Sequence, residues 1–114
     1  MEELRSVAKK AAALYPDADQ VIAVRTSKSN IYYFSNNVLS GNYTDETAFI
    51  QMLREKDDVY IQYVVCQWID GGLDLPSMHF RKLLLAADSR NGQAKILCQG
   101  FEQHVIRTLA QTMP

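Results

Sequence analysis

The centre of the predicted fold is the run Val59-Tyr60-Ile61-Gln62-Tyr63-Val64-Val65-Cys66-Gln67-Trp68. It is rich in β-branched and aromatic residues and is apolar on both faces, which is typical of a central, fully covered strand. Asp70-Gly71-Gly72 ends the strand, and Pro76 suits the first turn of a helix from about Ser77 to Ala87. The stretch therefore predicts an α/β sheet with helices on its faces.

The segment after that helix predicts a further strand. Ser89 to Gly92 reads as a turn, and Ala94 to Cys98 reads as a strand. A helix between two strands of one sheet implies a crossover, so we expect at least partly parallel pairing. Two interpretations of the tail stay open, an edge strand over Phe101 to Arg107 and a helix over Glu102 to Gln111.

The N-terminal part predicts a helix followed by a hairpin. The helix should end near Tyr15, because Pro16 disfavours helical geometry in the residue before it. Val21 to Val24 and Ile31 to Phe34 are short apolar runs separated by turn residues, which is typical of a β-hairpin. The apolar face of the helix consists of Leu4, Val7, Ala8, Ala11, Ala12 and Leu14.

Ser35 to Asn42 is polar and reads as a loop, after which Thr44 or Asp45 is expected to cap another helix. The apolar face of that helix includes Phe49, Ile50 and Leu53. The element order is α-β-β-α-β-α-β with one more element at the end. We expect one domain over residues 1–114, a three-layer α-β-α arrangement with a mixed sheet of about five strands.

Composition excludes several classes of protein. The 114 residues hold 12 Lys and Arg and 13 Asp and Glu, a formal net charge of −1, so no nucleic-acid or anionic-membrane partner is expected. The apolar runs are too short to span a membrane, and the acidic start is unlike a signal peptide. Cys66 and Cys98 lie in apolar stretches and are expected to be reduced core residues of a cytoplasmic protein.

Five segments, in order along almost the whole chain, resemble the cytidine deaminase family. The matching family motifs are an opening helix that ends in A-Y-x-P-Y, a loop with N-x-E-N, then C-A-E-R-x-A-I, P-C-G-x-C-R-Q-x-L and a closing T-L-x-E-L-L-P. The corresponding segments are Ala8–Pro16, Ile31–Gly41, Thr44–Ile50, Leu75–Leu84 and Thr108–Pro114.

The resemblance implies a zinc site whose ligands are absent here. Zinc deaminases use three protein ligands and a non-ligating Glu that moves protons. The two thiolate positions fall on Ser77 and Phe80, the third ligand position falls on Thr44, and the catalytic Glu falls on Glu46. A shift of one residue puts Asp45 at the catalytic position and still supplies no ligand. We therefore expect no metal cofactor and no zinc-dependent deaminase activity.

The remaining site candidates are expected to bind a ligand. Asn36 is the one Asn kept from the family loop, and Ser77 and His79 lie at the start of a helix. Arg81 matches an Arg that supports the zinc thiolates in the family, and we expect its charge to pair with Glu46 or Asp45, or with an anionic ligand. Tyr32, Tyr33, Phe34 and Tyr43 are interpreted as packing residues, with stacking on a base or ring as the alternative. For Trp68, at the end of the central strand, two interpretations stay open, a pocket lining and a subunit contact.

Three hypotheses follow. The first is a zinc-free, deaminase-like protein that binds a nucleoside-like molecule or assembles, as the family does, into a homo-oligomer. The second is an enzyme of altered acid/base chemistry in which Asp45, Glu46, His79 and Arg81 converge. The third is a structural or interaction module, including a roadblock-like or profilin-like fold with a strand in place of the helix from Ser77 to Ala87.

Overall fold

The computed structural model describes residues 1–114, and its central strand is β3 (Ile61–Trp68). The sheet has six strands in the order β2-β1-β3-β5-β6, and β4 pairs separately with β3. The β3–β5 pair is parallel and all other pairs are antiparallel, so the sheet is mixed as expected. The other strands are β1 (Gln20–Thr26), β2 (Ile31–Asn36), β4 (Leu73–Asp74), β5 (Lys95–Gln99) and β6 (His104–Thr108).

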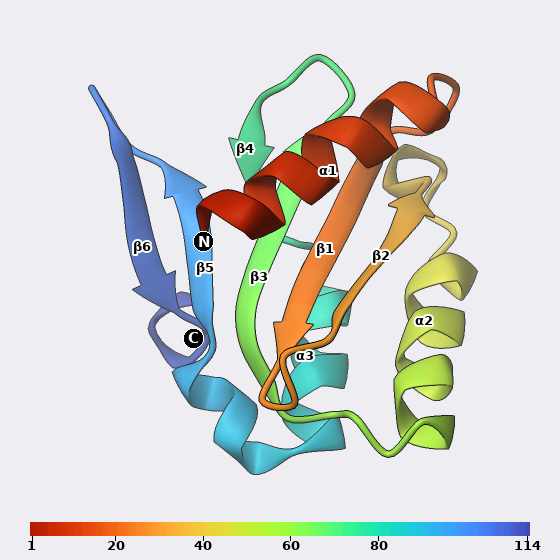
Figure 1. Ribbon diagram of the computed structural model, residues 1–114, viewed down its shortest axis with the longest axis vertical. Helices are drawn as coiled ribbons and strands as arrows, with labels where there is room; N and C mark the ends of the chain where they lie inside the picture. Colours follow the sequence, from red (N-terminus) through yellow and green to blue (C-terminus); the bar gives the residue numbers. More distant parts are fainter.

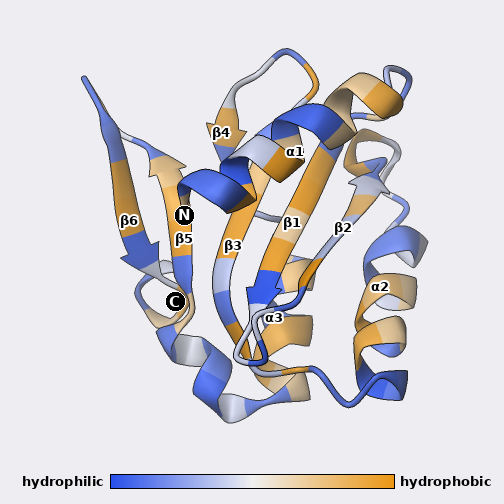
Figure 2. Cartoon of the chain, in the orientation of Figure 1, coloured by the Kyte–Doolittle hydropathy of each residue, from blue (hydrophilic) through white to orange (hydrophobic).

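Three α-helices cover the two faces of the sheet. Helix α1 (Glu2–Leu14) lies on one face, and α2 (Thr44–Glu55) and α3 (Met78–Ala87) lie on the other (Figure 1). Figure 2 shows that β1, β3 and β5 are hydrophobic along most of their length, because each packs against helices on both sides. The three-layer prediction is confirmed. The roadblock-like or profilin-like alternative is wrong, since α3 occupies the segment where it needs a strand.

The larger part of the core lies between the sheet and the pair α2 and α3. It joins side chains of β1, β3 and β5 to Phe49, Leu53, Phe80 and Leu84 on the two helices. On the opposite face, Leu4 and Ala8 of α1 pack against the sheet. Both helices of the larger core begin at the same end of the sheet, which brings their first turns close together (Figure 1).

The C-terminal tail forms strand β6 and then a short 3-10 helix over Ala110–Thr112. The strand interpretation is therefore confirmed with shorter bounds, and the helix over Glu102 to Gln111 is wrong. The physical reason is the antiparallel ladder that β6 completes along β5. Gly100 permits the tight return, because the carbonyl oxygen of Gln103 occupies the space that a Cβ at this position would need.

The start of α2 differs from the prediction. Neither Thr44 nor Asp45 caps the helix: Thr44 is its first residue, and Tyr43 precedes it without a side-chain cap. The side chain of Asn42 instead accepts a hydrogen bond from the Thr44 N–H at 2.9 Å. The predicted loop is also shorter, because β2 extends to Asn36 and Val38–Ser40 forms a 3-10 turn.

The two cysteines lie on neighbouring strands, Cys66 on β3 and Cys98 on β5, and both are free and buried. Both belong to the larger core, as the prediction of core packing requires. Burial raises the pKa of each thiol, and that of Cys66 rises far more. No helix in the chain combines the length and the apolarity that a membrane span needs.

Candidate functional site

Glu46 is a charged residue with no solvent exposure at all, and it marks the candidate site. It lies in the first turn of α2, where the helix dipole favours an anion. Ser77 at the start of α3 and Asn36 at the end of β2 both reach it, so three elements of the fold converge on one carboxylate. We call Glu46, Asn36, Ser77 and His79 the Glu46 cluster.

Three side chains of the Glu46 cluster surround the carboxylate. The Ser77 hydroxyl lies 2.7 Å from Oε1 and 2.9 Å from Oε2. The Asn36 amide donates to Oε2 at 2.8 Å, and Nδ1 of His79 lies 2.9 Å from Oε1. A buried carboxylate needs such partners, because an unpaired charge inside the protein is strongly destabilising.

The network assigns the proton positions. The Ser77 oxygen already accepts the N–H of Phe80 at 3.0 Å, which leaves its own hydrogen free to be donated to Glu46. The carboxylate oxygens can only accept, so Nδ1 of His79 must carry the proton in the 2.9 Å contact. Glu46 is therefore an acceptor in every one of its contacts.

Gln20 is a part of the site that the sequence did not reveal. Its amide oxygen accepts a second hydrogen bond from the Asn36 amide at 3.1 Å, and both residues are buried. Gln20 is a polar residue at the start of a strand, and nothing in the neighbouring sequence indicates that its side chain would contact the site. The amide oxygen of Asn36 has no hydrogen-bond partner although it is buried.

The exposed rim of the cluster consists of His79 and Tyr43. Their rings lie 4.8 Å apart with an interplanar angle of 30°, within the usual distance for aromatic contacts. The His79 side chain is 38% exposed and Tyr43 is 39% exposed, whereas Glu46 is sealed. His79 is therefore a partly exposed side chain in direct contact with a fully buried carboxylate.

Asp45 and Arg81 lie outside the cluster. Arg81 donates to the backbone oxygens of Pro76 at 2.9 Å and Thr112 at 2.8 Å, so it ties the C-terminal turn to α3. The expectation that it pairs with Glu46 or Asp45 is wrong: its hydrogen bonds go to these two carbonyls, and no ion pair joins it to either carboxylate. Asp45 makes no side-chain hydrogen bond or ion pair, and it borders a hollow of about 390 Å³ beside β2 with Tyr33 and Met52.

Of the other aromatic candidates, some make internal contacts and one does not. Phe34 stacks on Phe49 with ring centroids 4.3 Å apart, and the Tyr32 hydroxyl donates to Asp58 at 3.0 Å. Trp68 donates its indole N–H to Asp74 at 3.0 Å. Tyr33 is 41% exposed and free of such contacts.

The residues at the three ligand positions do not fit a zinc ion. Phe80 has no donor atom and is fully buried, with its ring 5.6 Å from Phe34 and 6.2 Å from Phe49. Ser77 offers a hydroxyl that Glu46 and the Phe80 N–H already occupy. Thr44 is exposed on the first turn of α2, and no group of three His, Cys, Asp or Glu side chains gathers anywhere in the chain.

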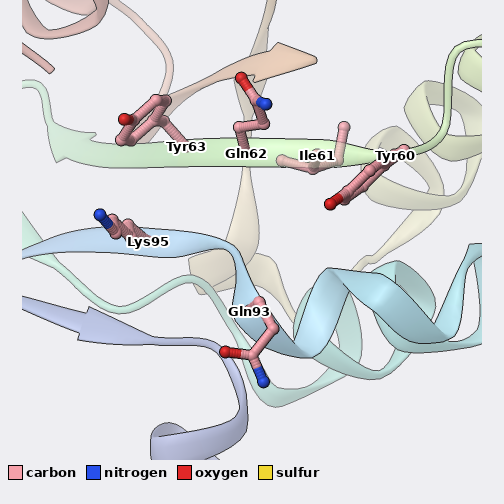
Figure 3. Close-up of a pocket in the computed structure, with 6 residues that line it drawn as sticks. All are labelled: Tyr60, Ile61, Gln62, Tyr63, Gln93 and Lys95. Atoms are coloured by element: carbon pink, nitrogen blue, oxygen red, sulfur yellow. The ribbon is translucent and has the colours of Figure 1, made fainter. Parts of the chain in front are cut away.

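Several surface hollows are lined by residues outside the cluster. One of about 220 Å³ opens where β3 begins, between β3 and β5, and Figure 3 shows its lining residues Tyr60, Ile61, Gln62, Tyr63, Gln93 and Lys95. It lies at the opposite end of β3 from Trp68, which pairs with Gln20 beside the cluster. None of the five main hollows is lined by Glu46, Ser77 or His79.

Comparisons with known proteins identify the fold. No protein-family model and no curated protein sequence matches the chain. Among solved structures, the cytidine deaminase from Mycobacterium leprae superposes with a TM-score of 0.74 at 20% identity, covering 99% of this chain and 96% of that one. The cytidine deaminase from Mycobacterium tuberculosis gives a TM-score of 0.69 at 21% identity, with 99% and 93% covered. The chain therefore has a cytidine-deaminase-like fold, as its sequence resemblance implied.

Proposed function

We propose that this chain is a zinc-independent, deaminase-like protein that binds a small nucleoside-like molecule and does not deaminate it. The observation that carries the proposal is the state of Glu46, whose two carboxylate oxygens are occupied by Ser77, Asn36 and His79. In zinc deaminases the corresponding Glu must exchange protons with a metal-bound water and the base. A sealed carboxylate with three internal donors is unsuited to that task.

The rim of the cluster supports the binding of a flat, polar molecule. Tyr43 offers a partly exposed ring for stacking, and His79 beside it offers a nitrogen. The Asn36 oxygen is unpartnered but buried within the cluster, so it does not belong to this rim. A heterocycle that carries hydroxyl or amino groups matches this combination of a ring surface and a hydrogen-bond acceptor.

A thermal-shift titration with nucleosides, nucleotides and free bases, with and without zinc, tests the proposal. A ligand that binds only the folded state raises the midpoint by mass action. We expect a saturable shift with a nucleoside, no shift with zinc, and no conversion of cytidine to uridine. Tyr43→Ala should abolish the nucleoside shift. Tyr33→Ala is the matched control, because Tyr33 is 41% exposed and Tyr43 is 39% exposed, and it should preserve the shift.

Two results would overturn the proposal. One is stoichiometric zinc that survives dialysis of the purified protein, which would mean that ligands exist where we see none. The other is the absence of a shift with every compound, which would remove the binding role and leave assembly as the function of the fold.

A specific contact favours a second candidate function, an enzyme of altered acid/base chemistry. Glu46 and His79 form a buried carboxylate–imidazole pair at 2.9 Å whose imidazole reaches solvent. Such a pair orients a histidine for proton transfer in many hydrolases. Asp45 and Arg81 have no part in it, so this candidate reduces to His79 supported by Glu46.

We also propose a cytoplasmic homo-oligomer with no nucleic-acid or membrane partner. Four apolar side chains are more than half exposed, which favours a protein surface over water for them: Leu14, Leu39, Phe101 and Ile106. Two free thiols suit a reducing compartment. Sedimentation velocity over a concentration series should show a species larger than 12.9 kDa, and a monomer at every concentration would contradict the assembly.

A further inference from the structure

The two histidines of the chain are held by opposite kinds of partner. Nδ1 of His79 faces the carboxylate of Glu46 at 2.9 Å, and a carboxylate only accepts. Nδ1 of His104 faces a guanidinium nitrogen of Arg5 at 3.0 Å, and a guanidinium only donates. The neutral ring of His79 therefore has its proton on Nδ1, whereas the neutral ring of His104 has its proton on Nε2.

The consequence for His79 concerns its second ring nitrogen. With Nδ1–H directed at Glu46, Nε2 keeps a free lone pair, and no side chain or backbone group is hydrogen-bonded to it. The ring is 38% exposed, whereas Glu46 is fully buried, and the contact with Tyr43 at 4.8 Å limits how the ring can turn. The lone pair of Nε2 is therefore available to accept a hydrogen bond from a donor that approaches from solvent.

We propose that Nε2 of His79 is the proton-accepting atom of this site, directed at a ligand that offers a hydroxyl or N–H group next to a flat ring. The inference rests on the proposed function for the class of ligand, but the state of His79 stands without it. The residues take distinct roles. Glu46 positions the imidazole, Ser77 and Asn36 hold Glu46, and Tyr43 forms one wall.

Long-range proton–nitrogen NMR of the nitrogen-15-labelled chain tests the state of His79 directly, because the chain contains only two histidines. In neutral solution we expect His79 to show the Nδ1–H tautomer and His104 to show the Nε2–H tautomer. Glu46→Gln should move His79 toward the mixture of a free imidazole and leave His104 unchanged. An Nε2–H tautomer for His79 in the intact protein would overturn the proposal.

Acylation by diethyl pyrocarbonate gives a second readout. The reagent forms a bond between an unprotonated ring nitrogen and its carbonyl carbon while ethyl carbonate departs, and the proton on the other nitrogen passes to Glu46 or to water. We expect His79 to be acylated severalfold faster than His104, although His104 is the more exposed residue. The advantage should be lost in Glu46→Gln, and faster acylation of His104 in the intact protein would count against the proposal.

A separate experiment tests whether Nε2 of His79 contacts the bound ligand. A nucleoside that shifts the midpoint of the intact chain should lose most of that shift in His79→Phe, which keeps a ring beside Tyr43 but removes Nε2. His79→Gln, which retains an acceptor, should recover part of it. If no nucleoside shifts the intact chain, the proposed function fails while the tautomer result still stands. If a nucleoside binds equally to His79→Phe, the ligand half is wrong and the proposed function survives.

Discussion

The Ser77 hydroxyl lies 2.7 Å from Oε1 of Glu46 and joins the first turn of α3 to the first turn of α2. The same oxygen accepts the N–H of Phe80, so Ser77 is the N-cap of α3 and a donor to Glu46 at once. A thiolate at this position would repel the carboxylate, whereas a hydroxyl stabilises it. This single contact couples the first turns of the two helices through a structural hydrogen bond.

Replacing Ser77 by Ala should destabilise the fold by about 1–3 kcal/mol, since it removes a cap and leaves a buried carboxylate with one donor fewer. Urea unfolding monitored by circular dichroism measures the loss. Ser27→Ala, at an exposed turn position, is the matched control and should change stability by less than about 0.5 kcal/mol. Equal stabilities of the two variants would show that Ser77 does not support Glu46.

Phe80 and Phe101 make a second matched pair. Phe80 is fully buried among Phe34 and Phe49, whereas Phe101 is 99% exposed. Phe80→Ala should cost about 3–5 kcal/mol, through lost burial and the cavity that remains, and Phe101→Ala should be nearly neutral. The difference in urea midpoints measures both effects. A small cost at Phe80 would mean that the surrounding core collapses onto the smaller side chain.

We expect Asp58 to make the free energy of unfolding depend on pH in the acidic range. Its burial by itself raises the pKa of the carboxyl, but hydrogen bonds from Asn30, Thr26 and Tyr32 and the charge of Lys28 together hold the pKa below its ordinary value of 3.8. A carboxyl with a lowered folded-state pKa contributes stability above its unfolded pKa. That contribution is lost as the pH falls from about 3.8 through the lower folded value.

Asp58→Asn should therefore be less stable than the intact chain at neutral pH, with a difference that shrinks in acid below the unfolded pKa of Asp58. Urea unfolding at several pH values checks this. Asp57→Asn is the control, because Asp57 is exposed and its side chain makes no hydrogen bond, and it should follow the intact chain at every pH. A constant deficit for Asp58→Asn from neutral to strongly acidic pH would contradict the linkage.

The two thiols should react slowly and at different rates. Burial raises the pKa of Cys66 strongly and that of Cys98 to a lesser degree, and the thiolate is the reactive form. Labelling with a thiol-specific disulfide reagent should modify Cys98 before Cys66 in the folded chain. In urea, which unfolds the chain, both thiols should react rapidly. Rapid reaction of Cys66 without denaturant would show that β3 opens locally.

Local sequence patterns predicted most of the elements and their order, because a buried face repeats at a regular spacing along a helix or a strand. The run from Val59 to Trp68 predicted the central strand, and the hairpin and the helix after Pro76 followed from short-range signals. Two predictions differed from the structure, at the start of α2 and in the C-terminal tail. The Thr44 N–H at the start of α2 is bonded to Asn42 and not to a capping side chain of Thr44 or Asp45, and the tail forms β6 because β5 offers it a partner.

The contacts of the candidate site could not be predicted from local patterns. The partners of Glu46 are 10, 31 and 33 positions away along the chain, and no local pattern records such a distance. Asn91 shows the same limit. As a turn residue it carries no further signal, yet its buried side chain accepts from the N–H of Ile61 and donates to the carbonyls of Val59 and Leu84. The spacing of apolar residues and the turn residues indicate which positions are buried. Which buried polar groups pair with one another depends on how the chain connections bring separate helices and strands together.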